Sequence, residues 1–146
     1  AKGLVLRANP IGLRPPGAHP SFLQWFVRVA EKNQSLSLFS DVLINPISTD
    51  TFSNIIANLI KNFRPGILHL GSKDTVNKAD IWRIVRARFP LFSGVVTESS
   101  VSKTSAGKIA RRPTKMWLNV KKAARLGISS PSWKTEVTKI LKELGL

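Results

Sequence analysis

The sequence predicts an α/β fold built from isolated strands and amphipathic helices. Short apolar runs of strand length alternate with longer segments whose apolar residues recur every three or four positions, as on one helix face. Serine, threonine or asparagine stands where those helical segments begin, and proline or glycine stands where several of them end. No unit recurs at a fixed spacing along the chain, which excludes a repeat architecture.

The first element is a buried strand over residues 3–8. The sequence Asn-Pro-Ile-Gly at 9–12 ends this strand, and proline and glycine make residues 14–20 a loop. Because domains rarely begin inside a buried strand, we expect the chain to be a fragment of a longer protein.

The next segment is a helix that begins at Ser21 and ends near Asn33. Ser21 and Gln24 have the spacing of a capping box. The apolar face of this helix consists of Phe22, Trp25, Phe26 and Val29. After the helix, two short strands around a turn are expected at 36–39 and 41–45.

A second helix begins at Ser48 or Thr49 and continues through Phe63. Pro46 excludes a central strand just before it, and the Pro-Gly pair at 65–66 ends it. Its apolar stripe is the most regular in the chain: Phe52, Ile55, Ile56, Leu59, Ile60 and Phe63.

The following segments predict a buried strand at 67–70 and a third helix from the cap Asn77 to Phe89. A strand at 95–97 and a polar, basic loop at 99–110 come next. The inward face of the third helix contains Ile81, Ile84, Val85 and Phe89.

Two helices complete the chain. Asn119 is expected to cap a short helix over 120–126, which Gly127 ends. Ser130 and Pro131 are expected to begin the last helix, with a cap followed by proline at the first position. The core face of that helix consists of Trp133, Val137, Ile140, Leu141 and Leu144.

Composition excludes several classes of site. The chain has no Cys, which excludes disulfides and Cys-based metal sites, and its two histidines, His19 and His69, are far apart in sequence. We therefore expect no metal site. No apolar run approaches the length of a membrane span.

The charge is strongly basic and uneven. The chain carries 23 Lys and Arg against 8 Asp and Glu, a net charge of +15. Residues 1–60 contribute five bases and three acids, whereas residues 61–146 contribute 18 bases and five acids. This balance indicates either an anionic partner or solvated basic helix faces, and composition leaves both open.

Several catalytic and nucleotide-binding motifs are absent. The Ser-Ala-Gly-Lys sequence at 105–108 lacks the first glycine and the final Ser or Thr of a phosphate loop. No dinucleotide-binding glycine fingerprint and no serine nucleophile elbow occurs. Asp41 and Asp50 do not predict a catalytic pair, because Asp50 suits a helix start.

Three features are candidates for ligand binding. The turn at 9–12 follows a strand, where α/β proteins bind ligands, although its spacing favours a plain strand-ending turn. Arg111 and Arg112 could bind a diphosphate bidentately or could be solvated, and Pro113 keeps Arg112 extended. Trp25 either packs in the core or stacks on a nucleotide base.

These pieces, in this order, resemble the extended short-chain dehydrogenase/reductase family, and in particular its dTDP-4-dehydrorhamnose reductase-like members. The resemblance covers about residues 3–145. The matching segments are Leu-Arg-Ala-Asn-Pro-Ile-Gly at 6–12, Ser-Phe-Leu-Gln-Trp at 21–25, Asp-Val-Leu-Ile-Asn-Pro-Ile at 41–47, Gly-Ile-Leu-His-Leu-Gly at 66–71, Arg-Arg-Pro at 111–113, Leu-Asn at 118–119 and Pro-Ser-Trp at 131–133.

The resemblance implies a two-part enzyme. An N-terminal Rossmann domain would hold NAD or NADP, and a catalytic Tyr with a Lys four residues later would precede the first strand of this chain. The chain contains no Tyr, so no catalytic residue is assigned. Residues 1–146 would be the C-terminal substrate-binding part of a Rossmann-type nucleotide-sugar reductase.

The resemblance also implies binding residues. Pro10 and Ile11 would pass near the nicotinamide, and Asn9 would lie near the sugar diphosphate. Asn45 would lie near the substrate, although Asn-Pro at 45–46 departs from the aromatic residue or His usual in broader relatives. The substrate-binding set is completed by Arg111 and Arg112 near phosphate and by the stacking candidate Trp25.

The expected partner is a nucleotide-sugar, most simply a dTDP-linked keto sugar. The enzyme is expected to be cytoplasmic and not to bind a membrane. A homo-oligomer is left open. Two alternatives remain: a basic nucleic-acid-binding module, which explains the charge but lacks any recognisable readout motif, and a non-catalytic regulatory relative of the same fold.

Overall fold

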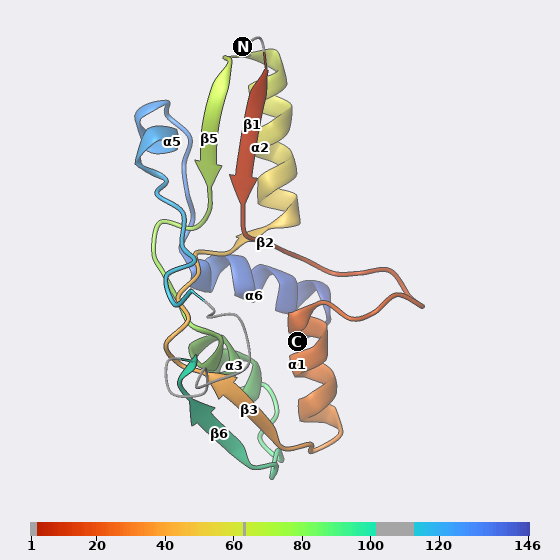
Figure 1. Ribbon diagram of the computed structural model, residues 1–146. Helices are drawn as coiled ribbons and strands as arrows, with labels where there is room; N and C mark the ends of the chain where they lie inside the picture. Colours follow the sequence, from red (N-terminus) through yellow and green to blue (C-terminus); the bar gives the residue numbers. More distant parts are fainter. Residues whose placement is uncertain (1–2, 63, 102–112) are drawn as a thin grey trace.

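Two small parallel sheets lie at opposite ends of the molecule, with a helix between them (Figure 1). The computed structural model describes residues 3–62, 64–101 and 113–146. One end, the β1–β5 lobe, contains β1 (Leu4–Ala8), β5 (Gly66–Leu70), α2 (Thr49–Lys61) and α5 (Lys121–Arg125). The other end, the β3–β6 lobe, contains α1 (Phe22–Glu31), β3 (Leu36–Phe39), α3 (Lys78–Arg86) and β6 (Val96–Ser99).

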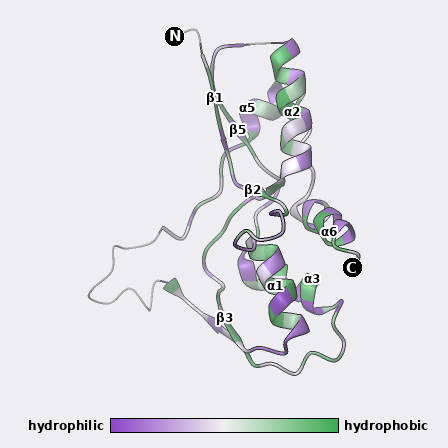
Figure 2. Cartoon of the chain, turned by 90° about the vertical axis from the view of Figure 1, so that its right-hand side faces the viewer, coloured by the Kyte–Doolittle hydropathy of each residue, from purple (hydrophilic) through white to green (hydrophobic). Residues whose placement is uncertain are grey.

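The middle of the molecule joins the two lobes. It consists of α6 (Trp133–Glu143) and of the two-residue parallel pair formed by β2 (Pro10–Ile11) and β4 (Ile47–Ser48). Hydrophobic and hydrophilic residues alternate along α1, α2 and α6 (Figure 2), as the sequence spacing predicts for amphipathic helices. No helix in the described part of the chain is long and apolar enough to cross a membrane.

The sheet of the β1–β5 lobe is buried on one face only. Its strands run parallel, with Leu4 opposite Gly66 and Ala8 opposite Leu70. Leu68 and Leu70 are buried toward α2, but Val5 is 51% exposed and Ile67 is 49% exposed on the other face. The prediction of two strands is therefore confirmed, whereas the prediction that they are buried is wrong for β1 and holds in β5 only at Leu68 and Leu70.

Helix α2 begins where its sequence predicts, because the Ser48 side chain accepts a hydrogen bond from the Thr51 N–H. Phe52, Ile55 and Leu59 pack against the β1–β5 sheet, yet no residue of α2 is fully buried. Ile60, expected on the apolar stripe, is 72% exposed. Phe63 lies outside the described residues.

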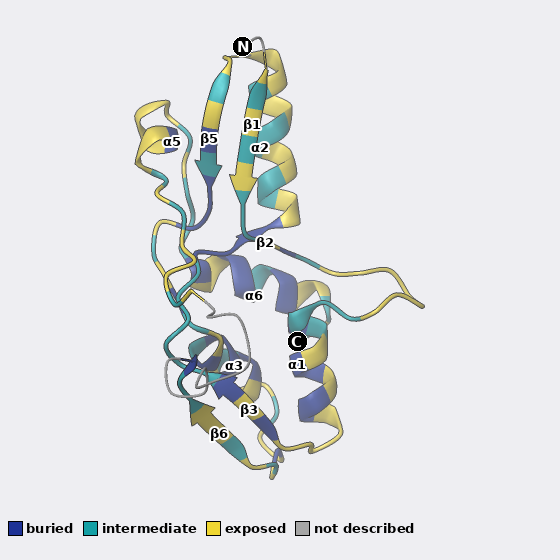
Figure 3. Ribbon diagram, viewed as in Figure 1, coloured by how far each residue is buried: buried dark blue, intermediate teal, exposed yellow. Residues whose placement is uncertain are grey.

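The β3–β6 lobe contains the larger core. In Figure 3 the buried residues concentrate on α1, α3 and α6, whereas α2 is half-buried or exposed. Helix α1 has the predicted capping box at Ser21 and Gln24. Its Trp25 is 40% exposed, so the expectation that Trp25 belongs to the core face is wrong. The large core side chains that are at most 2% exposed are Leu23, Phe26, Ile81, Trp82, Ile140 and Leu141.

The predicted strand at 41–45 does not form. Strand β3 pairs in parallel with β6, not with a neighbour in a hairpin. The 41–45 segment instead pairs with two distant partners in turn: Leu43 with Lys115 and Ile44 with Val76. Each partner takes only one residue, so no continuous strand results.

Three other boundaries differ from expectation. Helix α3 ends at Arg86 rather than Phe89. Asn119 accepts a hydrogen bond from the Lys121 N–H at 3.0 Å, but the capping residue of α5 is Val120. Helix α6 starts after Ser132, which caps it, and not at Ser130 and Pro131.

Candidate functional site

The carboxyl ends of β1 and β5 meet at one edge of their sheet, because the two strands are parallel. Asn9 follows β1 directly, and Gly71 follows β5. The carboxyl edge of a parallel sheet is where α/β proteins bind ligands. This edge faces the middle of the molecule, where β2 and β4 pair (Figure 1).

Asn45 is the centre of a hydrogen-bond cluster at this edge. Its Nδ2 donates to the carbonyl oxygens of Ser72 at 3.2 Å and Leu118 at 2.9 Å. Its Oδ1 accepts from the Leu118 N–H at 2.8 Å and from Asn9 Nδ2 at 3.3 Å. With 2% exposure and both donor hydrogens and both acceptor sites in use, Asn45 holds three chain segments together.

A glycine makes room for this cluster. A Cβ at Gly71 would lie 2.7 Å from Asn45 Nδ2 and 2.7 Å from the Asn45 backbone oxygen. Real Cβ atoms do not approach that closely, so any side chain at this position would displace Asn45. The glycine after β5 is therefore part of the same arrangement.

Asn9 connects the end of β1 to the cluster. Besides its bond to Asn45, its Nδ2 donates to the Met116 carbonyl at 3.0 Å. No residue of the described ranges donates to Asn9 Oδ1. Asn9 is half-buried and so retains an acceptor that a ligand hydroxyl could reach.

The segment after residue 112 brings further side chains to this edge. Leu43 donates its N–H to the Thr114 carbonyl at 2.8 Å, and Met116 donates its N–H to the Leu43 carbonyl at 2.9 Å. Met116 and Trp117 are 46% and 45% exposed, which makes them available to a ligand. Sequence reasoning did not single out Trp117, although a Trp just after a basic loop was the available signal.

The predicted site residues are only partly brought together. Asn9 and Asn45 touch, and Pro10 and Ile11 adjoin them in β2. Pro10 is exposed, whereas the Ile11 side chain is 5% exposed and packs into the core that α1 helps to form. Trp25 lies on α1, its ring 5.2 Å from that of Phe26. Arg111 and Arg112 lie outside the described residues.

The acidic residues near the middle of the molecule have structural partners. Asp41 accepts from Ser100 Oγ at 2.6 Å and from the Val101 N–H at 3.0 Å. Asp50 forms a surface ion pair with Lys139, and its hydrogen bond raises the pKa of the Lys139 ammonium. Within residues 3–62, 64–101 and 113–146, no three potential metal ligands gather.

Glu136 is a buried carboxylate that the sequence pattern did not reveal. It is 1% exposed on α6 and accepts hydrogen bonds from the Ser48 N–H and, at 3.0 Å, from Thr51 Oγ1. Its charge therefore lies at the N-terminus of α2, where the helix dipole favours an anion. This contact joins the central helix to the β1–β5 lobe.

Comparison with protein families gives one match, over most of the chain. Residues 16–146 match the model of the RmlD substrate binding domain. This match confirms the predicted resemblance to dTDP-4-dehydrorhamnose reductases in their substrate-binding part. No curated protein matches the chain.

Comparison with solved structures confirms the α/β fold class. The dTDP-4-dehydrorhamnose reductase from Yersinia enterocolitica has a TM-score of 0.78 at 23% identity, over 95% of this chain and 48% of that one. The enzyme of the same name from Bacillus anthracis, in complex with NADP, has a TM-score of 0.77 at 15% identity, over 96% and 48%. The UDP-glucose 4-epimerase of Thermus thermophilus, in complex with NAD, has 0.70 at 13% identity, over 97% and 46%. The chain thus spans about half the length of these proteins.

Proposed function

The chain belongs to the RmlD substrate binding domain family, and on that premise we propose that it is the substrate-binding part of an NAD(P)-dependent oxidoreductase of a nucleotide-linked keto sugar. The family match over residues 16–146 is the observation that carries the proposal. Residues 1–146 would be the C-terminal part of such an enzyme, with a dTDP-linked keto sugar as the substrate.

The open face of the β1–β5 lobe supports the proposal that a separate dinucleotide-binding part packs against this chain. Among the described strands, β1 pairs only with β5, so its other edge has unpaired backbone groups. Val5 and Ile67, opposite each other on the two strands, expose apolar side chains on one face of the sheet. A dinucleotide-binding part that adds a strand to β1 and a helix over this face would cover both features.

The residues at the carboxyl edge would make few contacts with the cofactor. Pro10 is exposed there, but the Ile11 side chain is buried, so only the Pro10 ring and the nearby backbone could touch a nicotinamide. NADH or NADPH, held mainly outside this chain, would supply the hydride. The chain itself would bind and orient the sugar nucleotide.

Different residues would bind the sugar, the diphosphate and the base of the substrate. Asn9 Oδ1 would accept a hydrogen bond from a sugar hydroxyl, while Asn45 keeps Asn9 and the 116–118 segment in position. Arg111 and Arg112 would bind the diphosphate, because guanidinium groups pair bidentately with phosphate oxygens. Trp25, with 40% of its surface exposed, would offer a ring face to the base.

The test uses the protein in its natural full-length form. NAD(P)H absorbance should fall when a dTDP-linked 4-keto sugar is added. Arg112→Ala should raise the dissociation constant for dTDP about 10- to 100-fold, since one charge-assisted hydrogen bond contributes about 1.5–3 kcal/mol. Arg88→Ala, an exposed arginine of the β3–β6 lobe, is the matched control and should change neither binding nor melting midpoint.

Two outcomes would contradict the proposal. If nucleic-acid binding falls in Arg112→Ala with a shallower salt dependence, while dTDP binding is unchanged, the basic nucleic-acid-binding alternative is supported. If the melting midpoint collapses and the affinity of the folded molecules is unchanged, Arg112 is structural. Thymidine without phosphate should respond little in either variant.

A further inference from the structure

A cavity of about 720 Å³ opens between α2, β5 and α5, away from the predicted substrate residues. Leu4 and Gly66, the first residues of β1 and β5, line it, so it lies toward the amino ends of these strands. The cluster around Asn9 and Asn45 lies beyond the carboxyl ends, and none of its residues lines the cavity. The volume is within the usual range for small-molecule sites.

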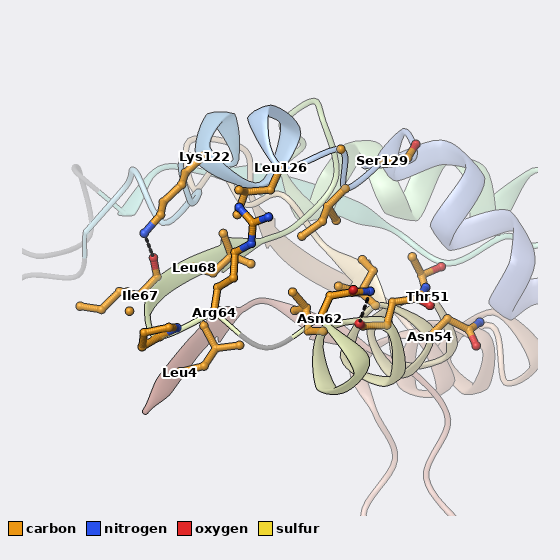
Figure 4. A pocket seen from close by; sticks show the side chains of 17 residues that line it. Leu4, Thr51, Asn54, Asn62, Arg64, Ile67, Leu68, Lys122, Leu126 and Ser129 are labelled. Atoms are coloured by element: carbon orange, nitrogen blue, oxygen red, sulfur yellow. Dashed lines mark hydrogen bonds between the residues drawn. The ribbon is translucent and has the colours of Figure 1, made fainter. Parts of the chain in front are cut away.

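The wall of the cavity is aliphatic with one polar stripe. Asn54 and Asn58 lie four residues apart on α2, which places their amides on one side of that helix, and Asn62 is the residue that caps its C-terminus. Asn62 Nδ2 donates to the Asn58 carbonyl, as Figure 4 shows. No aromatic residue of the described chain lines the cavity. The apolar lining residues are Leu4, Ile55, Leu59, Pro65, Ile67, Leu68, Leu126 and Ile128.

Two cationic side chains reach the cavity. Lys122 Nζ donates to the Ile67 carbonyl at 2.8 Å, which holds the ammonium at the start of β5 and leaves two further N–H donors. Gly66 has φ +128°, and a Cβ there would lie 3.6 Å from this ammonium. Arg64 extends from the α2–β5 connection toward α5 (Figure 4).

These cations have no acidic counterpart in the cavity. None of the eight Asp and Glu residues of the chain lines it, and none of the ion pairs among the described residues includes Arg64 or Lys122. Two cations beside an aliphatic wall favour an anion with an apolar body, because such a ligand satisfies both surfaces.

We propose that this cavity binds a small organic anion with an aliphatic body. Arg64 and Lys122 bind its carboxylate or phosphate, and the body lies against Leu59, Leu68 and Leu126. The asparagine stripe of α2 offers amides to any hydroxyl or carbonyl group along the ligand. This site is independent of the sugar-nucleotide site at the other end of the strands.

The test is calorimetric titration of the full-length protein with three probes of equal chain length: decyl phosphate, decanoate and decanol. The two anions should bind, and decanol should bind at least about tenfold more weakly, because it cannot form the charge-assisted bonds. Preference for decyl phosphate over decanoate identifies a phosphate ligand, and the reverse identifies a carboxylate; either result supports the proposal. Equal binding of decanol would overturn it.

Variants distinguish binding in this cavity from nonspecific attraction of anions to a basic protein. Arg64→Gln and Lys122→Met should each weaken anion binding about 10- to 100-fold, since each removes the charge and leaves much of the side chain. Lys121→Met, on the same helix but outside the cavity lining, is the matched control and should leave binding unchanged. Asn58→Trp should fill the cavity and abolish binding of every probe.

Three results would contradict the proposed site. The first is an equal loss of binding in Lys121→Met and Lys122→Met, which would mean a nonspecific charge effect. The second is binding of AMP but of neither decyl anion, which would mean a nucleotide. The third is a full-length protein that binds no probe while Asn58→Trp lowers its melting midpoint, which would mean that another part of the protein fills the cavity.

Discussion

The β3–β6 lobe and the β1–β5 lobe contain similar elements but bury them to different extents. In the first, α1 and α3, with the central helix α6 packed against them, enclose Leu23, Phe26 and Ile81, each with no exposed surface. In the second, α2 has no fully buried residue, and Val5 and Ile67 expose about half of their surface. Because apolar surface stabilises a fold only where water is removed, the two lobes should contribute unequally to the stability of this chain.

The largest effect is expected from a matched pair of leucine truncations. Leu23→Ala in the closed core should lower the free energy of unfolding by about 2–5 kcal/mol, the usual range for a buried leucine. Leu59→Ala, on half-buried α2, should cost less than half as much in the 146-residue chain. Urea unfolding of both variants measures the difference, and equal losses would contradict the comparison.

A second effect concerns the connection between the lobes. Glu136→Ala should destabilise the protein by about 1.5–3 kcal/mol, because the Ser48 N–H and Thr51 hydroxyl lose a charged acceptor. Hydrogen exchange should increase more in α2 than in α1. Glu143→Ala, an exposed acid on the same helix, should stay within about 0.5 kcal/mol of the parent protein. Uniform exchange across both helices would mean that Glu136 does not act through α2.

A substitution on the open face of the β1–β5 sheet tests whether another part of the protein covers that face. Ile67→Thr should change the stability of the 146-residue chain by less than about 0.5 kcal/mol, since the side chain is half-exposed. In the full-length protein the same change should cost more than about 1 kcal/mol, because a covering part would bury it. Equal small effects in both would show that this face stays exposed.

The same open face should affect association. The 146-residue chain alone should melt broadly and depend on concentration, because the unpaired edge of β1 and the exposed Val5 can pair with other molecules. It should also leave NAD(P)H absorbance unchanged with a nucleotide keto sugar, as it has no Tyr. A sharp, concentration-independent melt of a monomer would contradict the first expectation, and turnover the second.

The smallest effect should come from the surface pair of Asp50 and Lys139. Asp50 raises the pKa of Lys139, so the stabilisation from this pair is present below the ordinary lysine pKa of about 10.4 and is lost as pH rises through the raised value. Lys139→Gln should therefore differ from the parent protein near neutral pH and converge with it in strong alkali. Melting midpoints across that pH range measure it, and a difference that persists in strong alkali would point to packing instead.

Much of the local structure could be predicted from the residues. Ser21, Ser48 and Asn77 each cap the helix that the spacing assigns to them. A cap and an apolar periodicity act over a few residues, so neighbouring sequence contains the information. The predictions failed where local signals compete: Ser130 and Ser132 both suit a cap, and Ser132 is the one whose side chain accepts from the Thr135 N–H. Pro131 and Trp133 beside it are hydrogen-bonded to the distant Lys73 and Asp74. Trp25 similarly satisfies the helical spacing but lies at the edge of the buried face.

The sequence by itself determined the α/β class, the starts of α1, α2 and α3, and the family of this chain, because these depend on short-range order and on motif order. Only the tertiary structure decided that β3 pairs with β6, that Asn45 joins Asn9 to Leu118, and that Glu136 lies at the start of α2. The hydrogen bond from Asn9 to Met116 spans 107 positions, and that from Ser48 to Glu136 spans 88. No pattern of neighbouring residues encodes contacts over such separations, since they form only when the whole chain has folded.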